Sequence, residues 1–269
     1  MAARRDVTVV VPWWDLDPGF LTEALASLAG QERIARTLVV DNASTVAPAL
    51  PPGTEVLRLP ARVTLGAARN AALAQVETPY VLFLDADDLL LPGTIGFVAE
   101  RLDGRPDAVA SCSGIVAWDP ERGTRRTAAW PPAYAFRLCR RPLLCALVNT
   151  VRALVPMTAA VLRTDPVRAA GGFPDTGEED WVLSAALLFR GPALLDPRPG
   201  LQRRLRPDSR YALQHTDWRA SVAARRELRR RLRRDPAVPL LVRAAMPLLA
   251  VPHARNAFLR WRRARRGGP

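Results

Sequence analysis

The sequence lacks lysine, so all 39 basic residues are arginine, and only three of its 269 residues are cysteine. Cys112, Cys139 and Cys145 are odd in number and have no Cys-x-x-Cys spacing. This pattern predicts neither a zinc site nor a disulfide framework. A reducing, cytoplasmic compartment fits such cysteine usage best.

Long apolar runs and targeting signals are missing as well. No stretch of about 20 apolar residues occurs, which argues against a membrane-spanning helix. The polar N-terminus, Met1 to Asp6, leads directly into an apolar segment, which argues against a signal peptide. Hydrophobic residues make up 49% of the chain, so the composition predicts a globular protein rather than a disordered one.

The positive charge is concentrated at the C-terminus. The net charge is +13, but residues 1–130 carry −4, residues 131–197 carry +1 and residues 198–269 carry +16. We therefore predict a domain over residues 1–215 and a basic helical extension over residues 216–269. Basic, amphipathic, proline-broken segments are typical of helices that lie on an anionic membrane surface. A solvated helix packed on the domain explains the charge equally well, whereas nucleic-acid binding is less favoured because no nucleic-acid-binding fold accompanies it.

Hydrophobic periodicity predicts alternating strands and helices in the first half of the chain. The predicted strands cover residues 7–11, 37–40 and 55–59 and begin again at residue 80, and the helices between them cover residues 20–28 and 66–74. This alternation predicts an α/β fold with a mostly parallel, doubly wound sheet and helices on both faces. The second half is less regular, with a hairpin over residues 109–130, a packed helix or loop at 140–155, a strand at 157–162 and a helix at 182–189.

An acidic cluster follows the apolar strand that begins at Tyr80. Asp85, Asp87 and Asp88 come directly after it. In extended backbone Asp85 and Asp87 point to the same side, where two carboxylates repel each other and lose water. A hard cation, Mg²⁺ or Mn²⁺, relieves this cost and joins the carboxylates to a substrate phosphate. A polar turn explains the same residues, and an isolated Asp-x-Asp does not decide between the two.

Five short motifs occur in one order along residues 7–191. They are Val-Val-Val-Pro at 9–12, Val-Val-Asp-Asn-Ala-Ser at 39–44, Ala-Arg-Asn at 68–70, Leu-Asp-Ala-Asp-Asp at 84–88, and Gly-Gly-Phe at 171–173 followed by Glu-Asp-Trp at 179–181. Together they resemble the family-2 glycosyltransferases, which have the GT-A fold. The resemblance implies a GT-A-like α/β domain and an inverting, metal-assisted transfer of a sugar from a nucleoside diphosphate sugar to an acceptor hydroxyl.

The resemblance also implies roles for single residues. The donor-binding positions are Pro12, Trp14, Asp15, Asp41, Arg69 and Asp85. Among them, Asp41 matches the acid that accepts a hydrogen bond from the nucleotide base, and Arg69 matches a residue near the diphosphate, which suits a guanidinium. Asp85 and Asp87 match the pair that meets the ribose and the metal, where Mg²⁺ or Mn²⁺ acts as a Lewis acid.

On the acceptor side, Asp180 matches the general base that takes the proton of the acceptor hydroxyl. Glu179 and Trp181 flank it in the same acceptor-side segment. The acceptor is a saccharide or a lipid-linked hydroxyl of unknown identity. This interpretation favours cell-envelope glycan or glycolipid synthesis in the cytoplasm, with the protein peripheral on the inner membrane face. A binding protein on an inactive transferase-like scaffold is the alternative.

The chain departs from the family pattern at three places. Arg62-Val63-Thr64 stands where the family often has Asn-x-Gly, and a Gln-x-x-Arg-Trp motif is absent, which argues for single transfers. The histidine that is common after the last core helix is replaced by Arg203 to Arg206. Structural explanations also exist for several matched positions. Asp41 suits a turn, and Glu178 to Asp180 suit the N-terminus of a helix. Arg69 suits a solvated helix surface, and Trp13 and Trp14 suit packing in the core.

Overall fold

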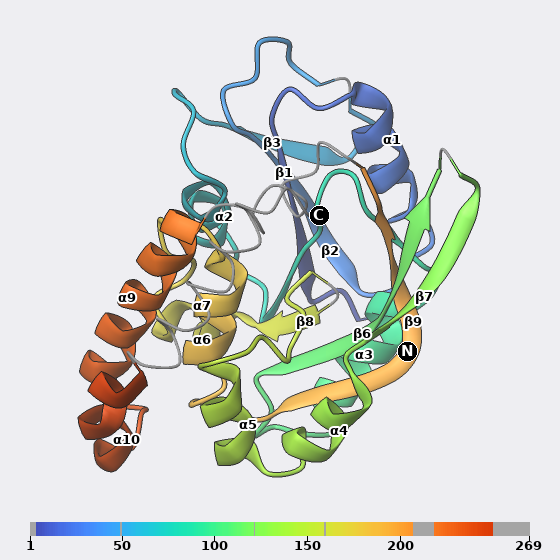
Figure 1. Ribbon diagram of the computed structural model, residues 1–269. Coiled ribbons are helices and arrows are strands. Elements are labelled where there is room, and N and C mark those ends of the chain that lie inside the picture. Colours follow the sequence, from blue (N-terminus) through green and yellow to red (C-terminus); the bar gives the residue numbers. More distant parts are fainter. Residues whose placement is uncertain (1–3, 49, 121, 159, 207–217, 250–269) are drawn as a thin grey trace.

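The computed structural model describes residues 4–48, 50–120, 122–158, 160–206 and 218–249 (Figure 1). The boundary predicted at residue 215 and the basic segment at residues 250–269 lie outside these residues. The strands are β1 (Val7–Trp13), β2 (Ile34–Asp41), β3 (Thr54–Arg58), β4 (Tyr80–Phe83), β5 (Leu89–Leu90), β6 (Ala110–Asp119), β7 (Thr124–Trp130), β8 (Ala160–Arg163) and β9 (Ala193–Arg204). The helices are α1 (Pro18–Ala26), α2 (Leu65–Leu73), α3 (Thr94–Asp103), α4 (Ala133–Cys139), α5 (Pro142–Asn149), α6 (Thr164–Ala169), α7 (Glu179–Leu187), α9 (Trp218–Arg234), α10 (Leu240–Ala245) and the 3₁₀ helix η1 (Met246–Leu249).

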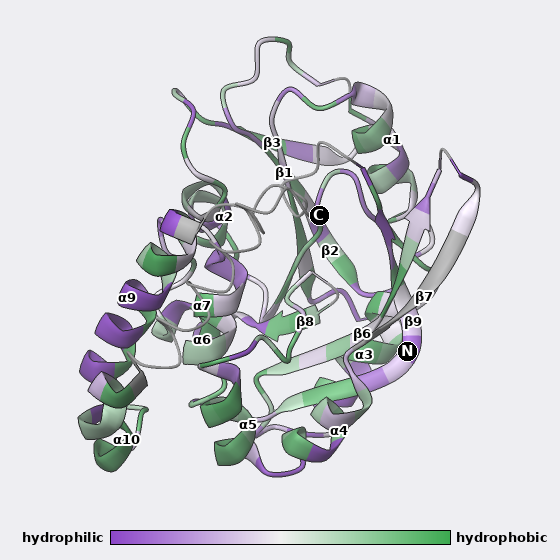
Figure 2. Ribbon diagram, in the orientation of Figure 1, coloured by the Kyte–Doolittle hydropathy of each residue, from purple (hydrophilic) through white to green (hydrophobic). Residues whose placement is uncertain are grey.

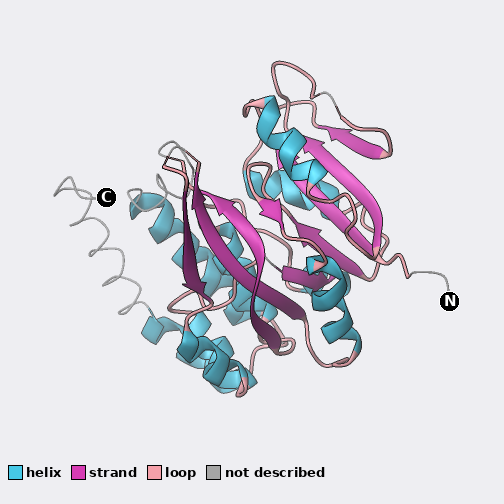
Figure 3. Ribbon diagram, turned by 90° about the vertical axis from the view of Figure 1, so that its right-hand side faces the viewer, coloured by secondary structure: helices cyan, strands magenta, loops and turns pink. Residues whose placement is uncertain are grey.

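One sheet organises the fold, with the strand order β3-β2-β1-β4-β8-β6-β9-β5 and with β7 paired to β6. The strands from β3 to β4 in that order are parallel, as are β6 and β9. Strand β8 runs antiparallel to both β4 and β6. Figure 3 shows helices on both sides of the strands. The α/β class predicted from the sequence is confirmed.

The sheet is doubly wound because β1 is apolar on both faces. Val10 packs in one core cluster with Ala68, Ala72 and Leu73 of α2. Val7, Val9 and Val11 point to the other face and pack in a second cluster with the apolar residues of α1 and α3. Alternate side chains of a strand point to opposite faces, so the valines of β1 pack in both cores.

The register of the parallel strands brings the predicted site segments to one edge of the sheet. Trp13 at the end of β1 pairs with Asp41 at the end of β2. Val10 pairs with Phe83, the last residue of β4. The loops after β1, β2 and β4 therefore leave the sheet side by side, at the edge where ligands bind in open α/β sheets.

Two local predictions are wrong. Strand β4 ends at Phe83, so Asp85 to Asp88 form a turn in which Asp88 N donates to Asp85 O at 3.0 Å, and the alternation of an extended backbone does not place their side chains. Helix α7 begins at Glu179 rather than Val182, because the acidic residues before Val182 are already helical. Acids in a first helical turn are favoured by the helix dipole.

The sequence analysis did not predict the 12-residue strand β9. It contains Pro197 and Pro199, which normally argue against a strand because proline cannot donate to the ladder. The register between β6 and β9 is irregular around Gly114, which pairs with Pro199. The strand tolerates its prolines through this irregularity, and its last residues reach the edge of the sheet that carries the site.

Helix α9 carries a narrow stripe of apolar residues four apart, and that stripe is in the core. Ala224, Leu228 and Leu232 are fully buried and belong to the same core cluster as α7. Arg190 and Asp235 form an ion pair at 2.7 Å next to this contact. No helix of the described part of the chain is long and apolar enough to cross a membrane.

We predict that Leu228→Ala lowers the free energy of unfolding by about 2–5 kcal/mol, because it leaves a cavity between α9 and the domain. Leu241→Ala is the matched control, since Leu241 is 84% exposed and should change stability little. Urea denaturation measures both. Equal, small effects of the two substitutions would show that α9 is a dispensable appendage.

Candidate active site

A cleft of about 1150 Å³ opens at the carboxyl ends of β1 and β4. The predicted site residues that line it are Pro12, Trp14, Asp15, Arg69, Asp85, Asp87, Glu179 and Asp180. Asp15 and Glu178, also in its wall, have positive φ angles of 41° and 58°. Strained backbone at non-glycine residues clusters at functional sites.

A buried arginine joins the acidic segments of the cleft. Arg69 on α2 is 1% exposed, and its guanidinium contacts three carboxylates. Nη2 donates to Asp85 Oδ1 at 2.7 Å, and Nη1 donates to Asp180 Oδ1 at 2.5 Å and to Glu179 Oε1 at 3.3 Å. Burial alone would lower the pKa of Arg69, but the attraction of Asp180, Asp85 and Glu179 outweighs it and raises that pKa. Arg69 is therefore a cation inside the cleft wall rather than a helix-surface charge.

The Ala-Arg-Asn and Gly-Gly-Phe motifs jointly hold this arginine in place. The Arg69 guanidinium lies 5.1 Å from the centre of the Phe173 ring. Asn70 Nδ2 donates to Phe173 O at 2.7 Å, and Phe173 N donates to Asn70 Oδ1 at 2.9 Å. Gly172 has a φ of 60°, and a Cβ there would collide with the Asn70 side chain. Two motifs about 100 residues apart are thus one packing unit.

Asp180 lies at the amino end of α7 with its side chain 35% exposed to the cleft. Burial raises the pKa of Asp180 to about 7, against the attraction of Arg69 and with added repulsion from Glu179 and Asp85. Asp180 therefore holds its proton more tightly than an ordinary aspartic acid does, and it exchanges this proton near neutral pH. A carboxylate with this property suits proton transfer.

The opposite wall of the cleft carries Trp14 and Asp15. Trp14 is 38% exposed, and the Arg62 guanidinium lies 3.2 Å from the centre of its ring. Asp15 accepts hydrogen bonds from Thr45 N at 2.8 Å and from Thr45 Oγ1 at 2.9 Å. Trp13 is buried in the core. The Arg62 guanidinium thus lies over one face of Trp14, and this stacked pair offers a flat surface for a planar group.

Two predicted site residues do not line the cleft. Asp41 is 1% exposed, and its carboxylate accepts from Ser44 N at 2.9 Å and from Arg58 Nη1 at 2.5 Å. It shapes the loop after β2, and its contact with a nucleotide base stays a prediction. Trp181 is buried and donates from Nε1 to Asn149 O at 2.6 Å, so it anchors α7 in the core.

Arginines at the end of β9 also contact the acidic turn after β4, a role that the sequence did not predict. Arg206 Nη2 lies 3.2 Å from Asp87 Oδ2, and the backbone N of Arg204 donates to Asp88 Oδ1 at 3.0 Å. Burial raises the pKa of Asp87, and so does repulsion by Asp85, while Arg206 opposes both. The signal in the sequence was the run from Arg203 to Arg206 at the position of the family's histidine.

The residues present fit a hard divalent cation. Asp85 and Asp87 both line the cleft and repel each other. Within the described residues no group of three or more His, Cys, Asp or Glu side chains could hold a metal ion. Two carboxylates suit Mg²⁺, which commonly takes its remaining ligands from water and substrate phosphates.

We predict that Arg69→Met lowers the free energy of unfolding at pH 8 by about 3 kcal/mol, since it leaves carboxylates unpaired in the cleft wall. The loss should shrink at pH 5, where Asp180, with its pKa raised to about 7, is protonated and carries no charge. Arg36→Met is the control, because Arg36 pairs with the half-exposed Glu55 and such surface pairs contribute less than about 1 kcal/mol. Urea denaturation at the two pH values measures both variants. A loss for Arg69→Met no larger than for the control would remove Arg69 as the organising charge.

Comparison with known sequences identifies one family over the first part of the chain. The family model described as "Glycosyl transferase family 2" matches residues 8–163. A teichoic acid poly(glycerol phosphate) polymerase of Staphylococcus epidermidis is 41% identical over 54 residues, which are 20% of this chain and 8% of that protein. The uncharacterized protein y4gI of Sinorhizobium fredii is 28% identical over 171 residues, 58% of this chain and 18% of that protein. The chain therefore spans less than a fifth of the length of either relative.

Solved structures match over nearly the whole chain. S. aureus TarS 1–349 in complex with UDP-GlcNAc has a TM-score of 0.63 at 17% sequence identity, covering 98% of this chain and 92% of that one. TarS 1–349 in complex with UDP has a TM-score of 0.57 at 16% identity, with coverage of 97% and 92%. At this identity the likeness concerns the fold, and it confirms the GT-A fold expected from the motifs.

Proposed function

This chain belongs to glycosyltransferase family 2, and we propose that it transfers a sugar from a nucleoside diphosphate sugar to an acceptor hydroxyl with inversion at the anomeric carbon. One observation carries the proposal. Asp180, partly exposed and with a pKa of about 7, faces the same cleft as Asp85 and Asp87 and is tied to Asp85 through Arg69. A base and a phosphate-binding pair in one cleft are the two parts that such a transfer needs.

The donor would lie between the two walls of the cleft. Trp14 and Arg62 offer a planar surface for the nucleotide base, and the arginines at the end of β9 suit the diphosphate charge. Support for a nucleotide-sugar donor comes from the solved TarS structures, which are complexes with UDP-GlcNAc and UDP. UDP-sugars are thus the first donors to test.

Asp85 and Asp87 would hold Mg²⁺ or Mn²⁺ together with the donor phosphates. Bound there, the cation would act as a Lewis acid that stabilises the charge of the departing diphosphate. Arg69 keeps one oxygen of Asp85 engaged, and Arg206 does the same for Asp87. These contacts fix the two carboxylates, so their orientation is set before the donor arrives.

Asp180 acts on the acceptor. As the acceptor oxygen bonds to the anomeric carbon, its proton moves to a carboxylate oxygen of Asp180, and the bond from that carbon to the diphosphate oxygen breaks. Arg69 holds Oδ1 of Asp180 in place throughout. Because the diphosphate leaves as an anion, no second carboxylic acid has to protonate it.

We further propose that the acceptor belongs to the cell envelope. Support comes from the short stretch of 41% identity with a teichoic acid polymerase. The cysteine usage supports a reducing, cytoplasmic setting for the reaction. The absence of Gln-x-x-Arg-Trp from the sequence favours single transfers over processive synthesis.

The test of the function is release of nucleoside diphosphate from a panel of sugar nucleotides, compared between the wild type and Asp180→Asn. General-base catalysis typically contributes about 10²–10⁴-fold in rate, so we expect turnover to fall by that factor while donor affinity is unchanged. Glu179→Gln, one residue away, is the matched control and should cost much less. Normal turnover in Asp180→Asn would exclude this residue as the base.

The pH profile gives the same assignment a second readout. Asp180 must be ionised to accept a proton, so turnover should rise with pH through its pKa of about 7 and be lost below it. Glu179 repels the ionised form of Asp180, so Glu179→Gln should move this acidic limb to lower pH. An unmoved limb would assign the limb to another group.

We predict that UDP binds more tightly in the presence of Mn²⁺, and that Asp87→Ala abolishes this difference. The reason is that Asp87 and Asp85 share the cation with the phosphates. Calorimetry with and without Mn²⁺ measures it, with Asp175→Ala, another acid of the cleft wall, as the control. Metal-dependent affinity that survives Asp87→Ala in a folded protein would contradict the metal role.

A further inference from the structure

Exposed apolar side chains gather at one end of the molecule. Helices α4, α5 and α10 lie at that end, and the loop between β1 and α1 lies at the other (Figure 1). Of the exposed large apolar residues in the described part of the chain, most are on these helices and η1, namely Tyr134, Leu143, Leu144, Leu240, Leu241 and Leu248. Figure 2 shows the apolar character of α5 and α10 there. This end is therefore apolar without being covered by any described part of the chain.

The apolar side chains stand out from a well-packed hairpin. Leu143 and Leu144, at the start of α5, are 51% and 39% exposed. Cys145 and Ala146, the next two residues, are fully buried in the core, and Cys139 Sγ of α4 lies 2.8 Å from Cys145 Sγ. The helix thus has a firmly held inner face, and its two leucines are not needed for that packing.

Positive charge lies next to these leucines. Arg137, Arg140 and Arg141 lie within or between α4 and α5, and all three are exposed. No acidic residue occurs between residues 122 and 164. An exposed apolar patch flanked by arginines is complementary to an anionic lipid surface.

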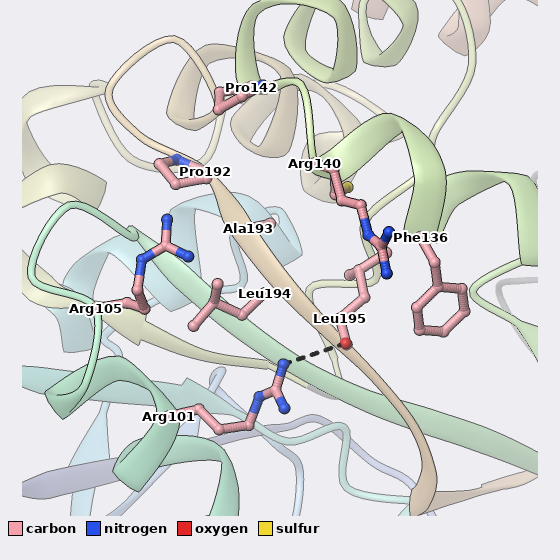
Figure 4. Close-up of a pocket in the computed structure, with 10 residues that line it drawn as sticks. Arg101, Arg105, Phe136, Arg140, Pro142, Pro192, Ala193, Leu194 and Leu195 are labelled. Carbon is pink, nitrogen blue, oxygen red and sulfur yellow. Dashed lines mark hydrogen bonds between the residues drawn. The ribbon is translucent and has the colours of Figure 1, made fainter.

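A second cavity lies beside the hairpin (Figure 4). It measures about 400 Å³, and its walls include Phe136, Pro142 and Leu195. Three arginines also line it, Arg101, Arg105 and Arg140 (Figure 4). Arg101 pairs with Asp196 at 3.2 Å and Arg105 with Asp107 at 2.9 Å, whereas Arg140 is exposed and has no ion pair with a described residue. The cavity thus combines an apolar wall with a guanidinium that is not matched by a carboxylate.

We propose that this end of the molecule docks on an anionic phospholipid bilayer. Leu143 and Leu144 enter the boundary between head groups and acyl chains, and a lipid phosphate lies in the cavity beside Arg140. Lipids with negative head groups attract such arginines, and the apolar side chains add the burial that charge alone does not give. The membrane contact is then made by α5 and by the cavity beside it.

The proposal is independent of the transfer reaction, since it uses no residue of the active-site cleft. It also predicts an orientation. The loop between β1 and α1, which carries Trp14 and Asp15, would point away from the bilayer (Figure 1). Donor and acceptor would then enter the cleft from the solvent side.

Vesicle flotation tests it. The full chain should float with vesicles of phosphatidylglycerol and phosphatidylcholine and not with phosphatidylcholine alone. We expect Leu143→Glu/Leu144→Glu to weaken this binding at least tenfold while UDP affinity stays at the wild-type value. Val46→Glu/Val56→Glu is the matched control, because both valines are exposed and away from this end, and the added charge is the same. Arg140→Gln should weaken binding severalfold and tests the cavity.

Four results would overturn the proposal. The first is that the wild type does not float with anionic vesicles. The second is that the leucine variant floats as well as the wild type, which would show that α5 is not the lipid contact. A third is equal losses in the leucine and valine variants, which would indicate a mere effect of net charge. The fourth is a lipid-free dimer, seen by sedimentation equilibrium and abolished by Leu143→Glu/Leu144→Glu, which would identify a second copy of the chain as the occupant.

Discussion

The contact of one buried guanidinium with three carboxylates is the constraint on which the active-site cleft depends. Arg69 binds acids from the turn after β4 and from the start of α7, which meet only in the folded chain. A buried arginine without partners would be very costly, so each of these segments has to be in place for the others to be stable. Burial in the same cluster raises the pKa of Asp180 to about 7, with Arg69 opposing the shift and Glu179 and Asp85 adding to it. The contact that holds the cleft together thus also sets the environment of the proposed base.

This constraint gives the sequence motifs a physical meaning. Gly-Gly-Phe provides a ring beneath Arg69 and a backbone that Asn70 holds with two hydrogen bonds. Gly66, four residues before Asn70, allows α2 to approach the loop closely, since a Cβ there would collide with the carbonyl of Pro174. Residues that look like phosphate ligands in a sequence are here also structural. Arg69 contacts carboxylates in the cleft wall before any phosphate arrives, and a phosphate would have to compete with them.

The sequence predicted the parts of the fold in which local pattern and burial agree. Valine runs at β1 and β2 identify buried strands because both faces of the sheet are covered, and the cleft at their carboxyl ends follows from parallel topology. Strand β9 was not predictable from its own residues, since Pro197 and Pro199 oppose a strand and only its pairing with β6 stabilises it. The burial of Asp41 and Trp181 was missed for a related reason: contacts with Arg58 and Asn149 are tertiary and leave no local trace.

The positive charge of the C-terminal quarter does not all lie at the surface. Arg225 of α9 pairs with Glu178 at 3.1 Å, just before the helix that carries Asp180, and Arg231 donates to Gly172 O at 2.7 Å. These two arginines hold the loop and the helix that form one wall of the cleft. Part of the charge of residues 198–269 therefore acts inside the protein and is not available to a membrane.

Removing this C-terminal segment would also expose Leu228 and its neighbours in the core, so any loss of lipid binding in a truncated chain would be ambiguous. Point substitutions on an exposed helix face separate the two effects, because they change the surface while the interior arginines keep their partners.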